Sequence, residues 1–181
     1  MHLPKHTRVR KKETGLSLLE LLITVAVAFL LLGAGVPGFR HLVLESRMTG
    51  AVNNLVRDLH FARQTANARA APVMVCPIAA GGRCRTDGQW QGGWQVMTRL
   101  ADSGPSGEFD QVLRREPGLM NINILSNRRV FVFRPFTLRD TNGTIAFCDE
   151  RGIDASRALV ISPSGRPRLA SRPETRRKVH C

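Results

Sequence analysis

A dense group of basic side chains stands near the C-terminal end of this 181-residue sequence. Residues 165–181 contain six of them against one acid, Glu174, a net charge of +5; they are Arg166, Arg168, Arg172, Arg176, Arg177 and Lys178. Arg166 and Arg168 are separated by one residue, so in an extended segment both side chains point to the same side. A guanidinium group presents paired donors that suit a phosphate better than an ammonium does. The pattern therefore predicts a binding site for a polyanion.

The residues beside these arginines favour close contact. Gly165 has no side chain and lets another backbone approach, whereas Pro167 stiffens the spacing of the two arginines. A site built on phosphate contacts binds in a strongly salt-dependent way, and few base-reading groups stand out, so we expect little sequence preference. The alternative is a solvated basic tail that serves solubility or subunit contact.

Catalytic residue types show no recognisable arrangement. The sequence contains no G-x-S-x-G, H-E-x-x-H or P-loop motif. Its five histidines fall in segments that we expect to be a leader, a helix or a tail; they are His2, His6, His41, His60 and His180. An envelope hydrolase tethered by its N-terminus is the alternative, but no residue pattern supports it. We therefore expect a protein that is not an enzyme and uses no cofactor.

The elements that would present the basic segment begin with an apolar stretch. Residues 1–15 contain five basic residues and one acid, a net charge of +4, and residues 16–36 form a 21-residue run with one charge, Glu20. A helix of that length covers about 31 Å, close to the ~30 Å hydrocarbon core of a bilayer. The positive-inside bias places the basic end in the cytoplasm and the rest of the chain across the membrane. A cleaved secretory signal fits less well because the run is long, and a plain signal anchor does not explain the carboxylate.

The segment Gly15-Leu16-Ser-Leu-Leu-Glu20 resembles the processing site of type IV prepilins and type II secretion pseudopilins. The resemblance implies that a prepilin peptidase cuts after Gly15 and that the new α-amine of Leu16 is methylated. It also implies that Glu20, fifth in the mature chain, neutralises this amine in a neighbouring subunit during assembly; the alternative is a surface carboxylate near the headgroups. Leu16 departs from the phenylalanine usual in the family. Pro37 falls at the twenty-second mature position, where proline is common, and is expected to loosen the helix.

Beyond Pro37 the pattern is that of an amphipathic helix. Apolar residues recur at steps of three or four: Met48, Val52, Leu55, Leu59, Ala62 and Ala66. We predict one long helix over residues 16–69. Residues 16–36 would lie in the membrane or a filament core, and the later part would pack its apolar stripe on a head domain.

Residues 70–181 are predicted to form a β-rich head domain that ends in a basic tail, residues 165–181. Short β-rich runs alternate with turn-forming residues; the strand candidates are 73–76, 93–100, 111–115, 121–125, 130–133, 144–147 and 157–161. Residues 102–107 and 140–143 have the composition of turns or loops. Because no helical pattern intervenes, we expect two small antiparallel sheets, one of them packed on the helix. The predicted fold class is α+β, and pilin-like as the resemblance implies.

Four cysteines fall in this head domain. If it lies outside the cytoplasm, disulfides can persist, and we expect Cys76–Cys84 and Cys148–Cys181. Four cysteines allow three pairings, and the sequence alone does not exclude the other two. A zinc site is the alternative, but the spacings lack C-x-x-C and His180 is the only nearby imidazole, so no metal is predicted.

Two further segments resemble the GspH/FimT branch of pseudopilins and minor pilins. The segment Trp90-Gln-Gly-Gly-Trp94 resembles a strand motif that follows a cysteine-bounded loop, and we expect a hairpin whose tryptophans pack in the core. A stacking platform for bases is the alternative. The segment Gly165-Arg166-Pro-Arg168 resembles the G-R-x-R motif of FimT-like minor pilins, which bind DNA during natural transformation. The motif itself covers Gly165, Arg166 and Arg168, and electrostatics adds Arg172, Arg176, Arg177 and Lys178 to the expected DNA-binding residues.

The resemblance implies a minor type IV pilin that binds extracellular DNA. Its partners would be DNA of any sequence, other major and minor pilins, the prepilin peptidase, and the inner membrane before assembly. The chain would cross the inner membrane once with a periplasmic head, and would reach the pilus filament or tip after assembly. The alternative is a GspH-like pseudopilin of type II secretion, a structural tip subunit without nucleic acid.

Overall fold

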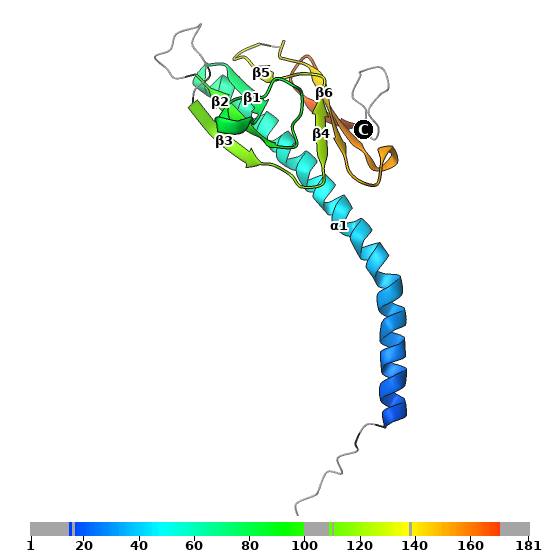
Figure 1. Ribbon diagram of the computed structural model, residues 1–181. Coiled ribbons are helices and arrows are strands. Elements are labelled where there is room, and N and C mark those ends of the chain that lie inside the picture. The colour runs from blue at the N-terminus through cyan, green and yellow to red at the C-terminus, as the bar shows by residue number, and fades with distance from the viewer. Residues whose placement is uncertain (1–14, 16, 100–108, 110, 138, 171–181) are drawn as a thin grey trace, which may run out of the picture. The chain divides into compact units, whose positions relative to one another are not determined.

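The computed structural model describes residues 15, 17–99, 109, 111–137 and 139–170, without the side chains of residues 34–37 (Figure 1). The chain divides into two compact units, Met1–Val43 and Leu44–Cys181. Helix α1, Leu18–Arg69, passes through both units. Residues 1–14 of the predicted leader, Leu16 and the loop at residues 102–107 lie outside the described residues.

The first unit contains the apolar half of α1. A window of 18 residues there has a mean hydropathy of 2.4, and none of it is buried. Large apolar side chains such as Leu18, Phe29 and Leu30 are 71–78% exposed. The helix continues past Pro37, whose side chain is not described. Among the described residues, this helix is the one long and apolar enough to cross a membrane.

The second unit contains two antiparallel sheets of four strands each. The first has the order β3-β2-β1-β5, with β1 Val73–Pro77, β2 Gly93–Thr98, β3 Gln111–Pro117 and β5 Phe131–Phe133. The second has the order β4-β6-β7-β8, with β4 Asn123–Ser126, β6 Gly143–Cys148, β7 Arg157–Ile161 and β8 Pro167–Ala170. Short 3-10 helices among the described residues are η1 Ala80–Gly82 and η3 Ile153–Ala155, both in connecting segments.

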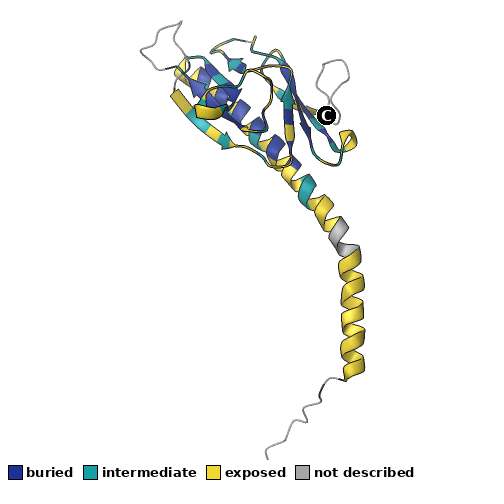
Figure 2. Cartoon of the chain, viewed as in Figure 1, coloured by how far each residue is buried: buried dark blue, intermediate teal, exposed yellow. Residues whose placement is uncertain are grey.

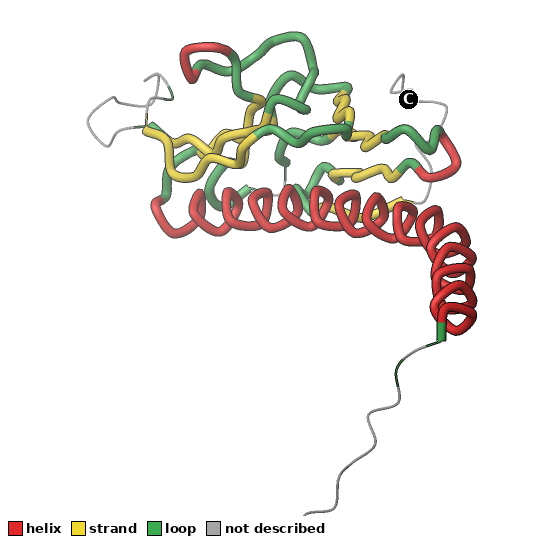
Figure 3. The backbone as a smooth tube through the Cα atoms, turned by 60° about the horizontal axis from the view of Figure 1, so that its bottom comes forward, coloured by secondary structure: helices red, strands yellow, loops and turns green. Residues whose placement is uncertain are grey.

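The predicted apolar stripe of α1 is buried in the head. Its six members are at most 5% exposed. They share one hydrophobic core with side chains of both sheets, including Val75 and Phe131 from the first and Phe147 and Leu159 from the second. Figure 2 shows these buried segments in dark blue, and Figure 3 shows the helix running alongside the strands. Two small antiparallel sheets were expected, one of them packed on the helix, and the structure has both sheets contributing side chains to the core that contains the helix stripe.

Of the eight strands in the described residues, the sequence patterns predicted seven and missed β8. All seven strand candidates overlap observed strands, with ends that differ by up to two residues. Strand β8 contains Pro167 and Arg168, which the sequence pattern assigns to a tail beyond the last strand. It pairs with β7 along the whole strand, from Ile161 with Pro167 to Ala158 with Ala170. The first part of the basic segment is thus a strand at the edge of a sheet.

The two tryptophans are fully buried, as predicted, but they do not form a simple hairpin. Trp94 lies in β2 of the first sheet. Trp90 precedes a turn, and its backbone N–H donates to the carbonyl oxygen of Ile124 in β4 of the second sheet at 2.8 Å. The segment therefore links the two sheets. Because both rings lie in the core, neither offers a surface on which a nucleobase could stack.

The predicted disulfide between Cys76 and Cys84 is present, with the Cα atoms 5.5 Å apart. Cys148 is disulfide-bonded as well. Its predicted partner, Cys181, lies outside the described residues, as do Arg172, Arg176, Arg177 and Lys178.

Candidate functional site

The turn between β7 and β8 positions the two arginines of the basic segment. The N–H of Gly165 donates to the carbonyl oxygen of Ser162 at 2.8 Å, and the N–H of Ser162 donates to that of Arg166 at 3.1 Å. The Ser162 hydroxyl also accepts the N–H of Arg166 at 3.1 Å. These bonds close a tight hairpin turn, so the position of Arg166 is determined by the backbone on both sides of the turn.

Arg166 and Arg168 occupy alternate positions where the chain enters β8. Arg168 lies opposite Val160, and Arg166 follows the same register opposite Ser162. Alternate residues of an extended strand project to one face, and Arg166 and Arg168 take such alternate positions on the way into β8. Both residues are exposed, and no carboxylate in the described part of the chain pairs with either. Two exposed guanidinium groups without an acidic partner in the described ranges can contact neighbouring phosphates.

Gly165 is required at this turn for two reasons. Its φ of +71° lies in the left-handed region that glycine adopts without strain. A Cβ there would lie 2.6 Å from Oδ2 of Asp140 and 2.9 Å from Nη1 of Arg63. The glycine of the motif therefore allows the turn to pack directly on a charged pair below it.

Asp140 ties this turn to the rest of the head. Its backbone N–H donates to the carbonyl oxygen of Pro163 at 2.8 Å, and its Oδ1 accepts the N–H of Arg134 at 3.0 Å. Its Oδ2 lies 3.9 Å from Nη1 of Arg63 on α1, and the carboxylate is 1% exposed. The β7–β8 turn is therefore anchored on the helix through one buried carboxylate.

Sequence reasoning missed four other arginines that the fold brings to the same end of the second sheet. Gly143 at the start of β6 pairs with Ile161 at the end of β7, and Ile161 also pairs with Pro167 at the start of β8. The connection that enters β6 and the β7–β8 turn therefore lie at the same end of the sheet. The turn after β4 joins them, because Ser126 pairs with Ile145. Exposed arginines on these connections are Arg128, Arg129, Arg134 and Arg139. They are distant from Arg166 in sequence, so linear spacing gave no signal for them.

A buried ion cluster holds the first sheet to α1. The indole Nε1 of Trp94 donates to Oδ2 of Asp58 at 2.9 Å, and Oδ1 of Asp58 lies 3.3 Å from Nη1 of Arg114. Arg114 also lies over the ring of Phe61, 5.0 Å from its centroid. The Asp58 side chain is 2% exposed, so this cluster orients the sheet on the helix and is not available to a ligand.

A second ion cluster joins the start of this unit to the second sheet. Glu45 accepts hydrogen bonds from Arg157 and Arg151, which hold the pKa of its carboxyl below the usual value of 4.5. Arg151 also pairs with Asp149 at 2.7 Å, and this contact raises the pKa of Arg151. Both of these arginines pair with acids, whereas Arg166 and Arg168 have no acidic partner among the residues that the structure describes.

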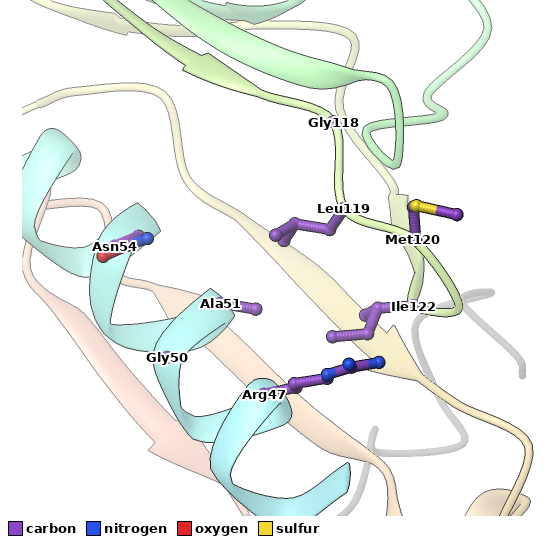
Figure 4. Close-up of a pocket in the computed structure, with 8 residues that line it drawn as sticks. All are labelled: Arg47, Gly50, Ala51, Asn54, Gly118, Leu119, Met120 and Ile122. Carbon is purple, nitrogen blue, oxygen red and sulfur yellow. The ribbon is translucent and has the colours of Figure 1, made fainter. Parts of the chain in front are cut away.

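A groove of about 340 Å³ lies between α1 and the connection from β3 to β4 (Figure 4). Its lining is mostly apolar and carries one charge; the residues are Arg47, Gly50, Ala51, Asn54, Gly118, Leu119, Met120 and Ile122. The described residues that line it include no carboxylate, imidazole or thiol. Within the described ranges, no three His, Cys, Asp or Glu side chains cluster as metal ligands would.

A profile of the family described as Type II transport protein GspH matches residues 51–165, more than half of the chain. The chain belongs to the GspH family. The chain is similar to crystal structures of the type IV minor pilin FimU from Pseudomonas aeruginosa in two crystal forms. One matches with a TM-score of 0.55 at 22% identity, covering 70% of this chain and 97% of the other. The second matches with a TM-score of 0.57 at 22% identity, covering 71% and 94%.

These similarities establish the pilin-like fold of this GspH-family member. A comparison with curated protein sequences found no match. The family profile ends at Gly165, so the family match does not include Arg166 and Arg168.

Proposed function

We propose that this GspH-family protein is a minor pilin whose head binds DNA through the β7–β8 turn and strand β8. The observation that carries the proposal is the pair Arg166 and Arg168. Both are exposed and free of acidic partners among the described residues, and they take alternate positions where the chain enters edge strand β8. Guanidinium groups in this arrangement contact phosphates of the backbone, which every DNA sequence shares. Binding is therefore independent of sequence and falls steeply with salt.

The proposed surface has further basic members. Arg172, Arg176, Arg177 and Lys178 follow β8 in the sequence and extend the positive charge beyond the motif. A DNA strand held by several such cations remains bound while individual contacts exchange. Retraction of a filament that carries this head would then draw the captured DNA toward the cell, as in natural transformation.

Assembly of the proposed pilin depends on its N-terminal part. Residues 1–15 would be the cytoplasmic leader, residues 16–69 the helix with a membrane-spanning part at 16–36, and residues 70–181 the periplasmic head. A prepilin peptidase would cut after Gly15 and Leu16 would be methylated. Glu20, exposed in the first turn of α1, would pair with the amine of a neighbouring pilin in the filament. Partners would then be other pilins and, before assembly, the inner membrane.

The test is a DNA mobility shift with the full chain purified in detergent. We expect the double charge reversal Arg166→Glu and Arg168→Glu to abolish the shift at low salt. The matched control is Arg47→Glu with Arg83→Glu, two exposed arginines away from the turn. Arg47 precedes Arg63 by sixteen helical residues, about 24 Å. Arg83 follows the Pro77 end of β1. The connection that contains Asp140 begins after Phe133, which pairs with Val73 at the opposite end of β1. Equal binding by both double variants would contradict the proposal.

The second candidate function is a structural subunit of type II secretion, because the matching profile carries that description. Such a subunit would share the fold and the N-terminal helix but would not need an unpaired arginine surface. It predicts that the Arg166→Glu, Arg168→Glu variant supports secretion normally and that the wild-type head does not shift DNA. A DNA shift by wild type that the variant loses would exclude it as the sole function.

A further inference from the structure

Phe136 is presented to solvent by the connection between β5 and β6. Its side chain is 82% exposed, although Phe131 and Phe133 just before it are buried. Its backbone has φ of +54°, a left-handed conformation that is unfavourable for a bulky residue. Its N–H donates to Oδ1 of Asn67 on α1 at 3.1 Å. The fold therefore holds a large aromatic ring outward in a backbone conformation that has a free-energy cost.

The support for Phe136 is the same scaffold that supports Arg166. Asn67 lies one helical turn after Arg63, so both reach the head from one face of α1. Asp140, which accepts the N–H of Arg134 and pairs with Arg63, closes the connection that carries Phe136. The N–H of Asp140 in turn bonds to Pro163 in the β7–β8 turn. The aromatic ring and the motif arginines thus project from two adjoining connections.

Arginines flank the exposed ring on both sides in the sequence. Arg134 and Arg139 are exposed and belong to the same connection. An aromatic face among cations is the arrangement with which proteins bind single strands, since a base stacks on the ring while cations hold the backbone. A duplex stacks its bases internally and leaves only the faces of its two end pairs open to such a ring.

We infer that Phe136 stacks on an unpaired nucleobase and gives the head a preference for single-stranded DNA. This inference rests on the proposed DNA binding at Arg166 and Arg168 and adds the strand type to it. Arg134 and Arg139 hold the phosphates beside the stacked base. Trp90 and Trp94 cannot take this role because both are fully buried.

The experiment measures affinity of the detergent-purified full chain for a 20-nucleotide single strand without self-complementarity and for the corresponding duplex. We expect Phe136→Ala to weaken single-strand binding roughly 5-fold to 100-fold, as loss of one stacked base does. Duplex binding should stay within about twofold, because phosphate contacts remain. Phe136→Trp should bind single strands about as tightly as wild type, because it keeps an aromatic face. Phe136→Leu, which is apolar but has no aromatic face, should bind them as weakly as Phe136→Ala.

The salt dependence of binding, the affinities for single strand and duplex, and entry into filaments separate the outcomes. For Phe136→Ala the salt dependence of single-strand binding should keep its slope, because no cation is removed. Unchanged single-strand affinity, or an equal loss for single strand and duplex, would overturn the stacking role while leaving the proposed function standing. A variant that binds single strands normally but no longer enters filaments would identify Phe136 as a contact to another pilin instead. If the wild-type chain binds neither DNA, the proposed function itself fails.

Discussion

Gly165 and Asp140 are packed so closely that a Cβ on the glycine would lie 2.6 Å from the carboxylate Oδ2. The contact places the turn that carries Arg166 directly on a buried acid, which pairs with Arg63 of α1. The surface that carries Arg166 and Arg168 is therefore packed against the rest of the head. Its geometry depends on packing between the helix, the β5–β6 connection and the β7–β8 turn.

Gly165→Ala tests this packing. The substitution adds backbone strain at φ +71° and a steric conflict with Asp140 and Arg63. We expect the free energy of unfolding to fall by roughly 2–4 kcal/mol and DNA affinity to fall with it. The control is Gly81→Ala, where φ is +78° but nothing lies within 4 Å, and a loss of about 1 kcal/mol without change in DNA binding is expected. Equal thermal melting curves for the two variants would contradict the packing argument.

Asp58→Ala should destabilise the head by roughly 2–4 kcal/mol. It removes the acceptor of the Trp94 indole N–H and leaves that donor and Arg114 without their buried partner. Trp94→Phe removes the donor of the same hydrogen bond. Thermal melts of the two single variants and the double variant give the coupling between them. Fully additive losses would show that the two groups do not interact as the structure places them.

Stability should depend on the ionisation of Glu45. Hydrogen bonds from Arg157 and Arg151 lower the folded-state pKa of this carboxyl below 4.5, so its contribution is complete above about pH 4.5. The contribution is lost as the pH falls through the lower folded-state pKa. The difference in melting temperature between wild type and Glu45→Gln should therefore shrink as the pH is lowered from 6 toward 3.

Asp87 provides the comparison for this titration. Arg85 lowers its pKa to about 2, so any effect of Asp87→Asn should persist to a lower pH than that of Glu45→Gln. A wild-type advantage over Glu45→Gln that grows on acidification would contradict the assignment of the ion cluster.

Removing the Cys76–Cys84 disulfide by double substitution to alanine should lower the free energy of unfolding by about 2.5 kcal/mol. The bridge joins residues eight positions apart and restricts the unfolded chain over that loop. Substitution is preferable to reductant, because Cys148 is disulfide-bonded as well and would be reduced at the same time. A denaturant melt measures the change, and an unchanged midpoint would show that the loop does not need the bridge.

The part of the helix that packs in the head was predictable from sequence, because its six stripe residues recur at helical spacing and all six are buried. Strand β8 was not, because Pro167 stands at its start and exposed arginines interrupt any apolar alternation. The grouping of Arg134 and Phe136 beside Arg166 depends on Asp140 bonding to Pro163, a contact between segments more than twenty residues apart. Local patterns hold no information about such contacts, so the motif was found but its surroundings were not.

The most direct test of the central claim is the salt dependence of duplex DNA binding by the full chain. We predict that Arg166→Gln with Arg168→Gln makes the slope of log affinity against log salt less steep by about 1.8, as expected for two lost phosphate contacts. Arg47→Gln with Arg83→Gln removes the same charge and should leave the slope unchanged. Identical slopes and affinities for wild type and both double variants would contradict the claim that Arg166 and Arg168 hold DNA.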